Sequence, residues 1–223
     1  MQWRLVAMLK AILWDNDGVL VDTEALYFRA CREALARLGI PLDEARYIEC
    51  FLRASDGLAR IAGAHGIDAP ALAQARTWRN ARYIALLRAG VPVIEGAGEV
   101  LRQLRGTVRM GIVTSARREH FELIHAGAEL LEFIDFTLVR EDYGQSKPSP
   151  EPYLTAMQRN GLAAEECLVI EDSERGLRAA LAAGLRCVVI PHGMTRGMDF
   201  TGALGQLDDI REVPALVGAL LQA

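Results

Sequence analysis

The chain has 223 residues, of which 51% are hydrophobic and 24% charged, and its formal net charge is −4 at pH 7. Such a composition is typical of a folded globular protein, and the acidic balance argues against a nucleic-acid partner. No apolar run approaches the roughly 18 residues that a membrane-spanning helix needs. The amino-terminal sequence MQWRLVAMLK also lacks the features of a secretory signal. We therefore expect a cytoplasmic protein with no membrane partner, either a monomer or a weak homo-oligomer.

The first predicted strand is the apolar run Leu9–Trp14. The stretch after it contains no further strand, and its apolar residues recur at helical spacing. The helices predicted there are Leu26–Leu38, Ser55–His65 and Ala71–Leu87. Because this stretch interrupts the sheet, we predict an inserted all-helical subdomain over residues 26–90. The catalytic core would then be formed by residues 1–25 and 91–223.

After the insertion, short apolar runs alternate with helical patterns. The runs have the continuous hydrophobicity of strands that are buried on both faces of a sheet. The predicted strands are Met110–Thr114, Ile134–Val139, Cys167–Ile170 and Arg186–Ile190, with a short edge strand near Gly205–Asp208. The predicted helices are Gly98–Leu104, Glu119–Ala126, Pro150–Asn160, Glu174–Ala183 and Val213–Leu221. This alternation predicts an α/β fold with a doubly wound parallel sheet.

Carboxylates, hydroxyls and an ammonium group follow the predicted strands. In an open α/β sheet, ligands bind beyond the carboxyl ends of the strands, so these side chains should converge at one edge. They are Asp15, Asp17, Thr114, Ser115, Lys147, Glu171 and Asp172. Lys147 is notable because it and Lys10 are the only lysines among the 25 basic residues.

This set of side chains suits phosphoryl transfer assisted by Mg²⁺. Carboxylates without histidine or cysteine ligands favour a hard cation such as Mg²⁺. Asp15 can attack a phosphorus atom whose charge is neutralised, and Asp17, two residues away, can act as general acid and base. Thr114 or Ser115 can donate a hydrogen bond to the phosphoryl oxygens. Lys147 can neutralise their charge and keep the nucleophile ionised.

Four segments resemble the motifs of the haloacid dehalogenase superfamily, and they occur in the family's order. They are residues 15–24 (DNDGVLVDTE), 113–115 (VTS), 146–152 (SKPSPEP) and 170–176 (IEDSERG). The resemblance implies a Rossmann-like core and a small helical cap inserted after the first motif. It also implies that Asp15 becomes phosphorylated and that the backbone carbonyl of Asp17 contacts Mg²⁺. In the same way it implies that Asp172 is a direct metal ligand, with Glu171 supporting the site through a metal-bound water.

Within that superfamily the resemblance favours the phosphatase and β-phosphoglucomutase-like branch. The dehalogenase branch needs neither Mg²⁺ nor the second aspartate, and the phosphonate-cleaving relatives need a cap lysine that is absent from residues 26–89. Mutases of this kind typically carry a histidine at the position of Tyr27. We therefore predict a phosphatase acting on a small phosphorylated metabolite, of the sugar phosphate or phosphoglycolate type, with a phosphosugar mutase as the alternative. Tyr27, Arg53 and Arg79 are the candidate substrate-binding residues of the cap.

A third hypothesis is a non-catalytic signalling domain. Response-regulator receivers also arrange carboxylates, a hydroxyl and a lysine around a phosphorylated aspartate. Receivers are, however, about half as long and lack a cap insertion. In addition, their acidic pair comes first in the chain, whereas Glu171 and Asp172 come last here.

Overall fold

The computed structural model describes residues 8–54 and 57–222, and its sheet contains six parallel strands within that part of the chain. The strands are β1 (Ala11–Trp14), β2 (Arg109–Val113), β3 (Phe136–Leu138), β4 (Cys167–Glu171), β5 (Arg186–Val189) and β6 (Gly205–Gln206). Their order is β3-β2-β1-β4-β5-β6, so the chain moves outwards from β1 in one direction and then from β4 in the other. This is the predicted doubly wound parallel sheet, and each predicted strand is confirmed to within one or two residues.

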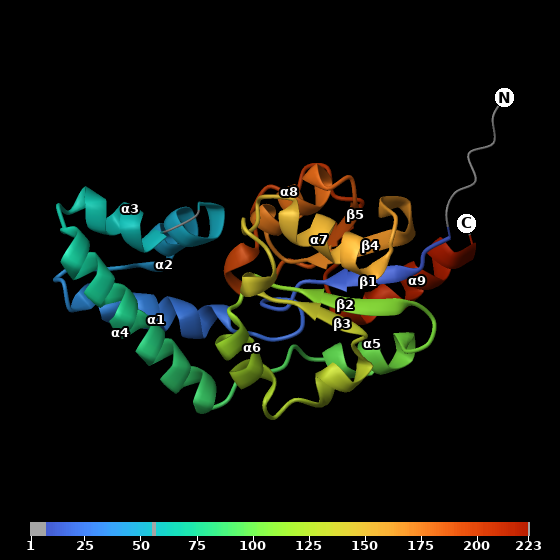
Figure 1. Cartoon of the computed structure of the whole chain (residues 1–223), viewed down its shortest axis with the longest axis horizontal. Coiled ribbons are helices and arrows are strands. Elements are labelled where there is room, and N and C mark those ends of the chain that lie inside the picture. The colour runs from blue at the N-terminus through green and yellow to red at the C-terminus, as the bar shows by residue number, and fades with distance from the viewer. Residues whose placement is uncertain (1–7, 55–56, 223) are drawn as a thin grey trace.

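Helices cover both faces of this sheet (Figure 1). Alternate residues of β1 take part in two separate hydrophobic clusters, one on each face: Ile12 and Trp14 in the first, Ala11 and Leu13 in the second. The first face packs against α5 (Ala97–Leu104), α6 (Arg118–His125) and α9 (Val213–Gln222). The second packs against α7 (Glu151–Asn160) and α8 (Glu174–Ala182). Because both faces are buried, every residue of β1 and β4 is apolar except the last of β4, Glu171.

The remaining helices lie together beyond one end of the sheet (Figure 1). They are α1 (Glu24–Ala36), α2 (Glu44–Tyr47), α3 (Gly57–Ala64) and α4 (Ala69–Arg88), and a π-helical segment, Ile48–Arg53, follows α2. They bury a third hydrophobic cluster of their own, which includes Leu35, Tyr47 and Ile61. The three helices predicted in this stretch are confirmed, although the predicted start at Ser55 lies outside the described residues.

The two chain segments that connect α1–α4 to the sheet pair with each other. Asp22 donates a backbone hydrogen bond to the carbonyl of Pro92 at 2.8 Å, and Ile94 donates one to the carbonyl of Leu20 at 3.0 Å. Entry to and exit from the helical segment therefore lie side by side, next to the end of β1. Within the described residues, no helix combines the length and the apolar character that crossing a membrane would require.

Candidate active site

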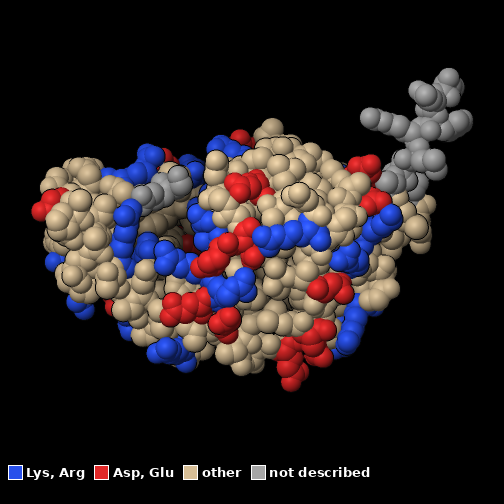
Figure 2. Space-filling model, viewed as in Figure 1, with Lys and Arg blue, Asp and Glu red and all other residues tan. Residues whose placement is uncertain are grey.

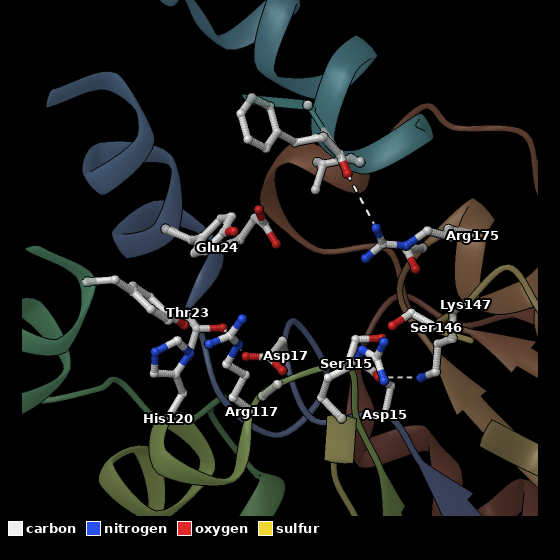
Figure 3. Close-up of a pocket in the computed structure, with 18 of the residues that line it drawn as sticks. Asp15, Asp17, Thr23, Glu24, Ser115, Arg117, His120, Ser146, Lys147 and Arg175 are labelled. Carbon is white, nitrogen blue, oxygen red and sulfur yellow. Dashed lines mark hydrogen bonds and ion pairs between the residues drawn. The ribbon is translucent and has the colours of Figure 1, made fainter. Parts of the chain in front are cut away.

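The strand ends and the helices α1, α3 and α4 enclose a cavity of about 400 Å³. The space-filling view shows the hollow between these helices and the rest of the molecule, with basic side chains gathered around it (Figure 2). Figure 3 shows Asp15, Asp17, Ser115 and Lys147 grouped on the sheet side of this space. The predicted site residues that line the cavity are Asp15, Asp17, Tyr27, Arg79, Ser115, Lys147 and Asp172.

Lys147 lies at the centre of the site and is only 4% exposed. Its ammonium donates hydrogen bonds to Oδ1 of Asp15 at 2.6 Å, to Oε1 of Glu171 at 2.7 Å and to the carbonyl of Val113 at 2.8 Å. Burial alone would lower the pKa of Lys147, but the neighbouring Asp15 and Glu171 carboxylates raise it above its usual value. Because an ammonium has three N–H donors, all of them are used by protein acceptors.

The carboxylate of Asp15 has one oxygen held and one free. Lys147 binds Oδ1, while no described residue donates a hydrogen bond to Oδ2. Burial raises the pKa of Asp15 to about 7, against the opposing effect of Lys147, and Glu171 and Asp17 raise it further. A second cation near this group would therefore favour its ionised, nucleophilic form.

Three buried carboxylates, those of Asp15, Glu171 and Asp172, have oxygen atoms within 4.8 Å of one another. One ammonium, that of Lys147, balances only part of this charge. Burial, together with Asp15 and Glu171, raises the pKa of Asp172 well above its usual value. A cluster of oxygen ligands with this excess of negative charge fits a hard divalent cation.

Glycine at position 18 allows Asp172 to approach the loop after β1. Gly18 has a φ of +87°, and a Cβ at this position would lie 2.1 Å from Oδ2 of Asp172. Any other residue would therefore meet both an unfavourable backbone conformation and a clash with the carboxylate. The glycine of the first motif thus keeps the ends of β1 and β4 in close contact.

Glu171 is held from several sides. Its Oε1 accepts hydrogen bonds from Lys147 and from the Tyr153 hydroxyl, both at 2.7 Å. Its Oε2 accepts from the backbone N–H of Asp172 and from the Ser173 hydroxyl, both at 3.3 Å. Because both oxygens of Glu171 already accept two hydrogen bonds each, Glu171 is less available than Asp172 as a direct metal ligand.

The carboxylate of Asp17 is separated from that cluster and lies on the side of α1. Oδ2 accepts a hydrogen bond from the Thr114 hydroxyl at 3.0 Å, and Oδ1 accepts one from the Thr23 hydroxyl. Thr114 is fully buried and is not among the residues that line the cavity; its hydroxyl donates to Asp17 and accepts a hydrogen bond from the backbone N–H of Ala116 at 3.0 Å. The neighbouring Ser115 does line the cavity.

Two histidines of α6, His120 and His125, are buried next to the site. His125 is 6% exposed, and its Nε2 lies 2.8 Å from Oδ1 of Asn16, the residue between the two aspartates. Burial lowers the pKa of His125 to about 4. It is therefore a neutral group that donates to Asn16 and supports the loop from behind. His120 lines the cavity, with its ring edge-on to Tyr83 at a centroid distance of 5.1 Å.

Of the three substrate-binding candidates that the sequence offers within residues 26–90, Tyr27 and Arg79 line the cavity and Arg53 does not. The guanidinium of Arg79 lies 5.3 Å from the ring centroid of Tyr27 and donates to the side chain of Asn80. Arg53 instead lies near Glu49, at 3.7 Å, and Glu174, at 4.0 Å, and does not line the cavity.

Sequence reasoning missed several charged residues of the cavity wall, among them Glu24 and Arg175. Glu24 accepts a hydrogen bond from the Tyr47 hydroxyl, and burial raises its pKa above the usual value. Arg175, on α8, reaches the backbone carbonyl of Phe51 at 3.5 Å, a contact that is visible in Figure 3. Both lie within motif segments, 15–24 and 170–176, so their closeness to the strand ends was the available signal.

Comparisons with known proteins identify the family of the chain. The family model described as haloacid dehalogenase-like hydrolase matches residues 12–190. Protein CbbY of Cereibacter sphaeroides is 33% identical over 97% of this chain and 99% of its own. A validoxylamine A 7'-phosphate phosphatase of Streptomyces hygroscopicus subsp. limoneus is 32% identical over 92% of this chain and 96% of its own. A crystal structure of CbbY from Rhodobacter sphaeroides in complex with xylulose-(1,5)bisphosphate has a TM-score of 0.78 and 31% identity, covering 91% of this chain and 95% of that one. The chain therefore belongs to the haloacid dehalogenase-like hydrolases and is an enzyme of that family.

Proposed function

We propose that the protein is a Mg²⁺-dependent phosphatase that hydrolyses a small phosphorylated metabolite through an aspartyl phosphate at Asp15. The observation that carries this proposal is a buried carboxylate, held at one oxygen by Lys147 and free at the other, that faces a cavity beside an acidic cluster. A free carboxylate oxygen next to neutralising charge is what a nucleophilic attack on phosphorus requires.

In the proposed mechanism, Oδ2 of Asp15 attacks the phosphorus atom and the alcohol leaves. Asp17 donates a proton to the leaving oxygen, and in the second step it accepts a proton from the water that attacks the aspartyl phosphate. Thr23 and Thr114, which donate to the two oxygens of Asp17, hold it in place for both steps. Lys147 keeps Asp15 ionised and aimed, and its charge acts on the phosphoryl group at short range.

The residues that would hold Mg²⁺ are Asp15 and Asp172 directly, with the backbone carbonyl of Asp17, while Glu171 would support the site from behind. The ion would supply positive charge next to the phosphoryl oxygens, which lowers the barrier to attack by a carboxylate. The excess negative charge of the buried carboxylates supports this assignment. Adding a chelator should abolish turnover, and adding Mg²⁺ back should restore it.

We further propose that residues 26–90 form a cap over a core of residues 1–25 and 91–223. The pairing of the two connecting segments, Asp22 with Pro92 and Leu20 with Ile94, supports a movement of α1–α4 as a unit. A cap of this kind excludes water while the aspartyl phosphate forms and selects the substrate.

The substrate class that the cavity supports is a sugar phosphate, with phosphoglycolate as a smaller candidate. A volume of about 400 Å³ accommodates more than the phosphate, and Glu24, Arg79 and Asn80 offer polar contacts to hydroxyl groups. Two relatives carry names or ligands of this chemical type, a validoxylamine phosphate and a xylulose bisphosphate. A screen of phosphorylated metabolites for phosphate release tests the proposal. Asp15→Asn should abolish the release, and retained activity would refute the mechanism.

Tyr27 supports hydrolysis over phosphosugar transfer. Burial raises its pKa to about 12, so the phenol stays neutral and does not replace a titrating histidine near neutral pH. Incubation with a hexose 1-phosphate separates the two activities, because a mutase would yield the 6-phosphate and not free phosphate. A single-turnover, stable phospho-aspartate would instead favour the signalling domain.

A further inference from the structure

The position of Asp15 depends on the residues that hold Lys147. All three N–H donors of Lys147 are occupied, so its ammonium cannot shift towards one acceptor without loosening another. Two of these acceptors are carboxylates, Asp15 and Glu171. Whatever fixes Glu171 therefore also sets how Lys147 shares its bonds with the nucleophile.

Tyr153, on α7, contacts both Glu171 and Lys147. It is fully buried, its hydroxyl donates to Oε1 of Glu171 at 2.7 Å, and the Lys147 ammonium lies 4.9 Å from its ring centroid. The same oxygen of Glu171 thus receives the tyrosine hydroxyl and the ammonium. Burying a hydroxyl costs free energy unless it is hydrogen-bonded. The hydroxyl that distinguishes this tyrosine from a phenylalanine therefore serves to bind Glu171.

We propose that Tyr153 is a positioning residue, which acts through Glu171 and Lys147 to hold the Asp15 carboxylate in its attacking orientation. The inference rests on the proposed function, because it assigns a task only if Asp15 is the nucleophile. Tyr153 does not line the cavity, so it acts on Asp15 and not on the bound substrate.

The physical step is a competition for Glu171. With the tyrosine hydroxyl in place, the charge of Oε1 is shared between two donors. Without the hydroxyl, Lys147 is the remaining donor to Oε1 of Glu171. The ammonium therefore moves towards Glu171, and its hydrogen bond to Asp15 becomes weaker. The other oxygen, Oε2, stays bound to Ser173 and to the backbone of Asp172, so Glu171 does not simply turn away.

The first test is Tyr153→Phe, which keeps the ring and removes the hydroxyl. We expect kcat to fall about tenfold, the size expected for a lost hydrogen bond to a charged group, with KM within about twofold of the wild-type value. Val217→Ala is the control, because this buried residue of α9 lies on the opposite face of the sheet and its truncation also reduces stability. An unchanged kcat in Tyr153→Phe, or an equal loss in Val217→Ala, would overturn the proposal.

The second test is a double-mutant cycle with Glu171→Gln. If Tyr153 acts through Glu171, the double variant should have nearly the kcat of Glu171→Gln alone, whereas independent roles would give multiplied losses. If Tyr153→Phe does not fold, the kinetics of Glu171→Gln become the test of the inference. This variant should have a lower kcat and an unchanged KM. Wild-type kcat in Glu171→Gln would then overturn the inference.

A third readout does not depend on turnover. Beryllofluoride with Mg²⁺ mimics a phosphoryl group on an aspartate, so its binding reports the orientation of Asp15. We expect Tyr153→Phe to weaken this binding about tenfold, whereas Val217→Ala binds as the wild type does. Equal binding by the wild type and Tyr153→Phe would overturn the inference about Tyr153 but leave the proposed function standing. A wild-type protein that neither releases phosphate nor binds beryllofluoride would overturn the proposed function as well.

Discussion

Lys147→Arg should remove most of the activity without unfolding the protein. The side chain is 4% exposed and its ammonium donates to three acceptors at 2.6–2.8 Å, so the site has no room for a wider group. A planar guanidinium keeps the positive charge but spreads its donors in a fork with different geometry. It cannot bind Asp15, Glu171 and the Val113 carbonyl at the same time.

The magnitude follows from the bonds that are lost. A hydrogen bond to a charged group contributes about 1.5–3 kcal/mol, and the substitution should break or distort two such bonds. A loss of about 3–6 kcal/mol of transition-state stabilisation corresponds to a fall in kcat of about two to four orders of magnitude. Because the charge remains, the buried carboxylates keep a counter-ion and the fold should persist.

The assay compares phosphate release by the wild type, Lys147→Arg and Lys10→Arg. Lys10 is the other lysine of the chain, with a side chain that is 57% exposed and paired with Glu166, so its replacement by arginine should change neither kcat nor Tm. Circular dichroism and thermal unfolding show that each variant is folded. A near-wild-type kcat in Lys147→Arg would refute the reasoning.

Three further predictions follow from the same structure. Gly18→Ala should lose activity, because the new Cβ would lie 2.1 Å from Oδ2 of Asp172. Gly39 has a similar positive φ but open space around it, so Gly39→Ala should keep its activity and lose only about 1–2 kcal/mol of stability. Equal activity in the two variants would count against the clash. Arg79→Met should raise KM because Arg79 lines the cavity, while Arg53→Met should not, and the same KM in both would contradict this. The pKa of His125 is about 4 in the folded protein and about 6.5 in the unfolded chain. Between pH 4 and pH 6.5, His125 therefore binds a proton mainly in the unfolded state. The free energy of unfolding should therefore fall by about 3 kcal/mol as the pH drops through that window. Urea unfolding should show that His125→Gln lacks this decrease, and a decrease identical to that of the wild type would refute the assignment.

The fold and the centre of the site could be predicted because they depend on local sequence signals and on topology. Continuous apolar runs mark buried parallel strands, and parallel strands bring their carboxyl ends to one edge of the sheet. Asp15, Thr114 and Asp172 therefore had to lie near one another once the strands had been identified. The α2 helix was missed although Asp43 gives it a standard start, accepting a hydrogen bond from the backbone of Arg46 at 2.8 Å.

What could not be predicted depends on how elements pack in three dimensions. Arg53 and Arg79 look alike in sequence, but only the orientation of their helical segments decides which one faces the cavity. The burial of His120 and His125 likewise depends on how α6 packs against the sheet. The hydrogen bond from the Thr114 hydroxyl to Asp17 joins residues 97 positions apart in the chain, and only the folded arrangement reveals it.

The most direct test of the account is to identify the phosphorylated residue during turnover. The wild-type protein is mixed with Mg²⁺ and a substrate found by the metabolite screen, quenched in acid and digested, and the peptides are analysed by mass spectrometry. The account predicts a phosphoryl group on Asp15, which builds up in Asp17→Asn because hydrolysis of the intermediate slows. Both the label and phosphate release should disappear in Asp15→Asn. Sustained phosphate release without a label on Asp15, or with a label on another residue, would contradict the central claim.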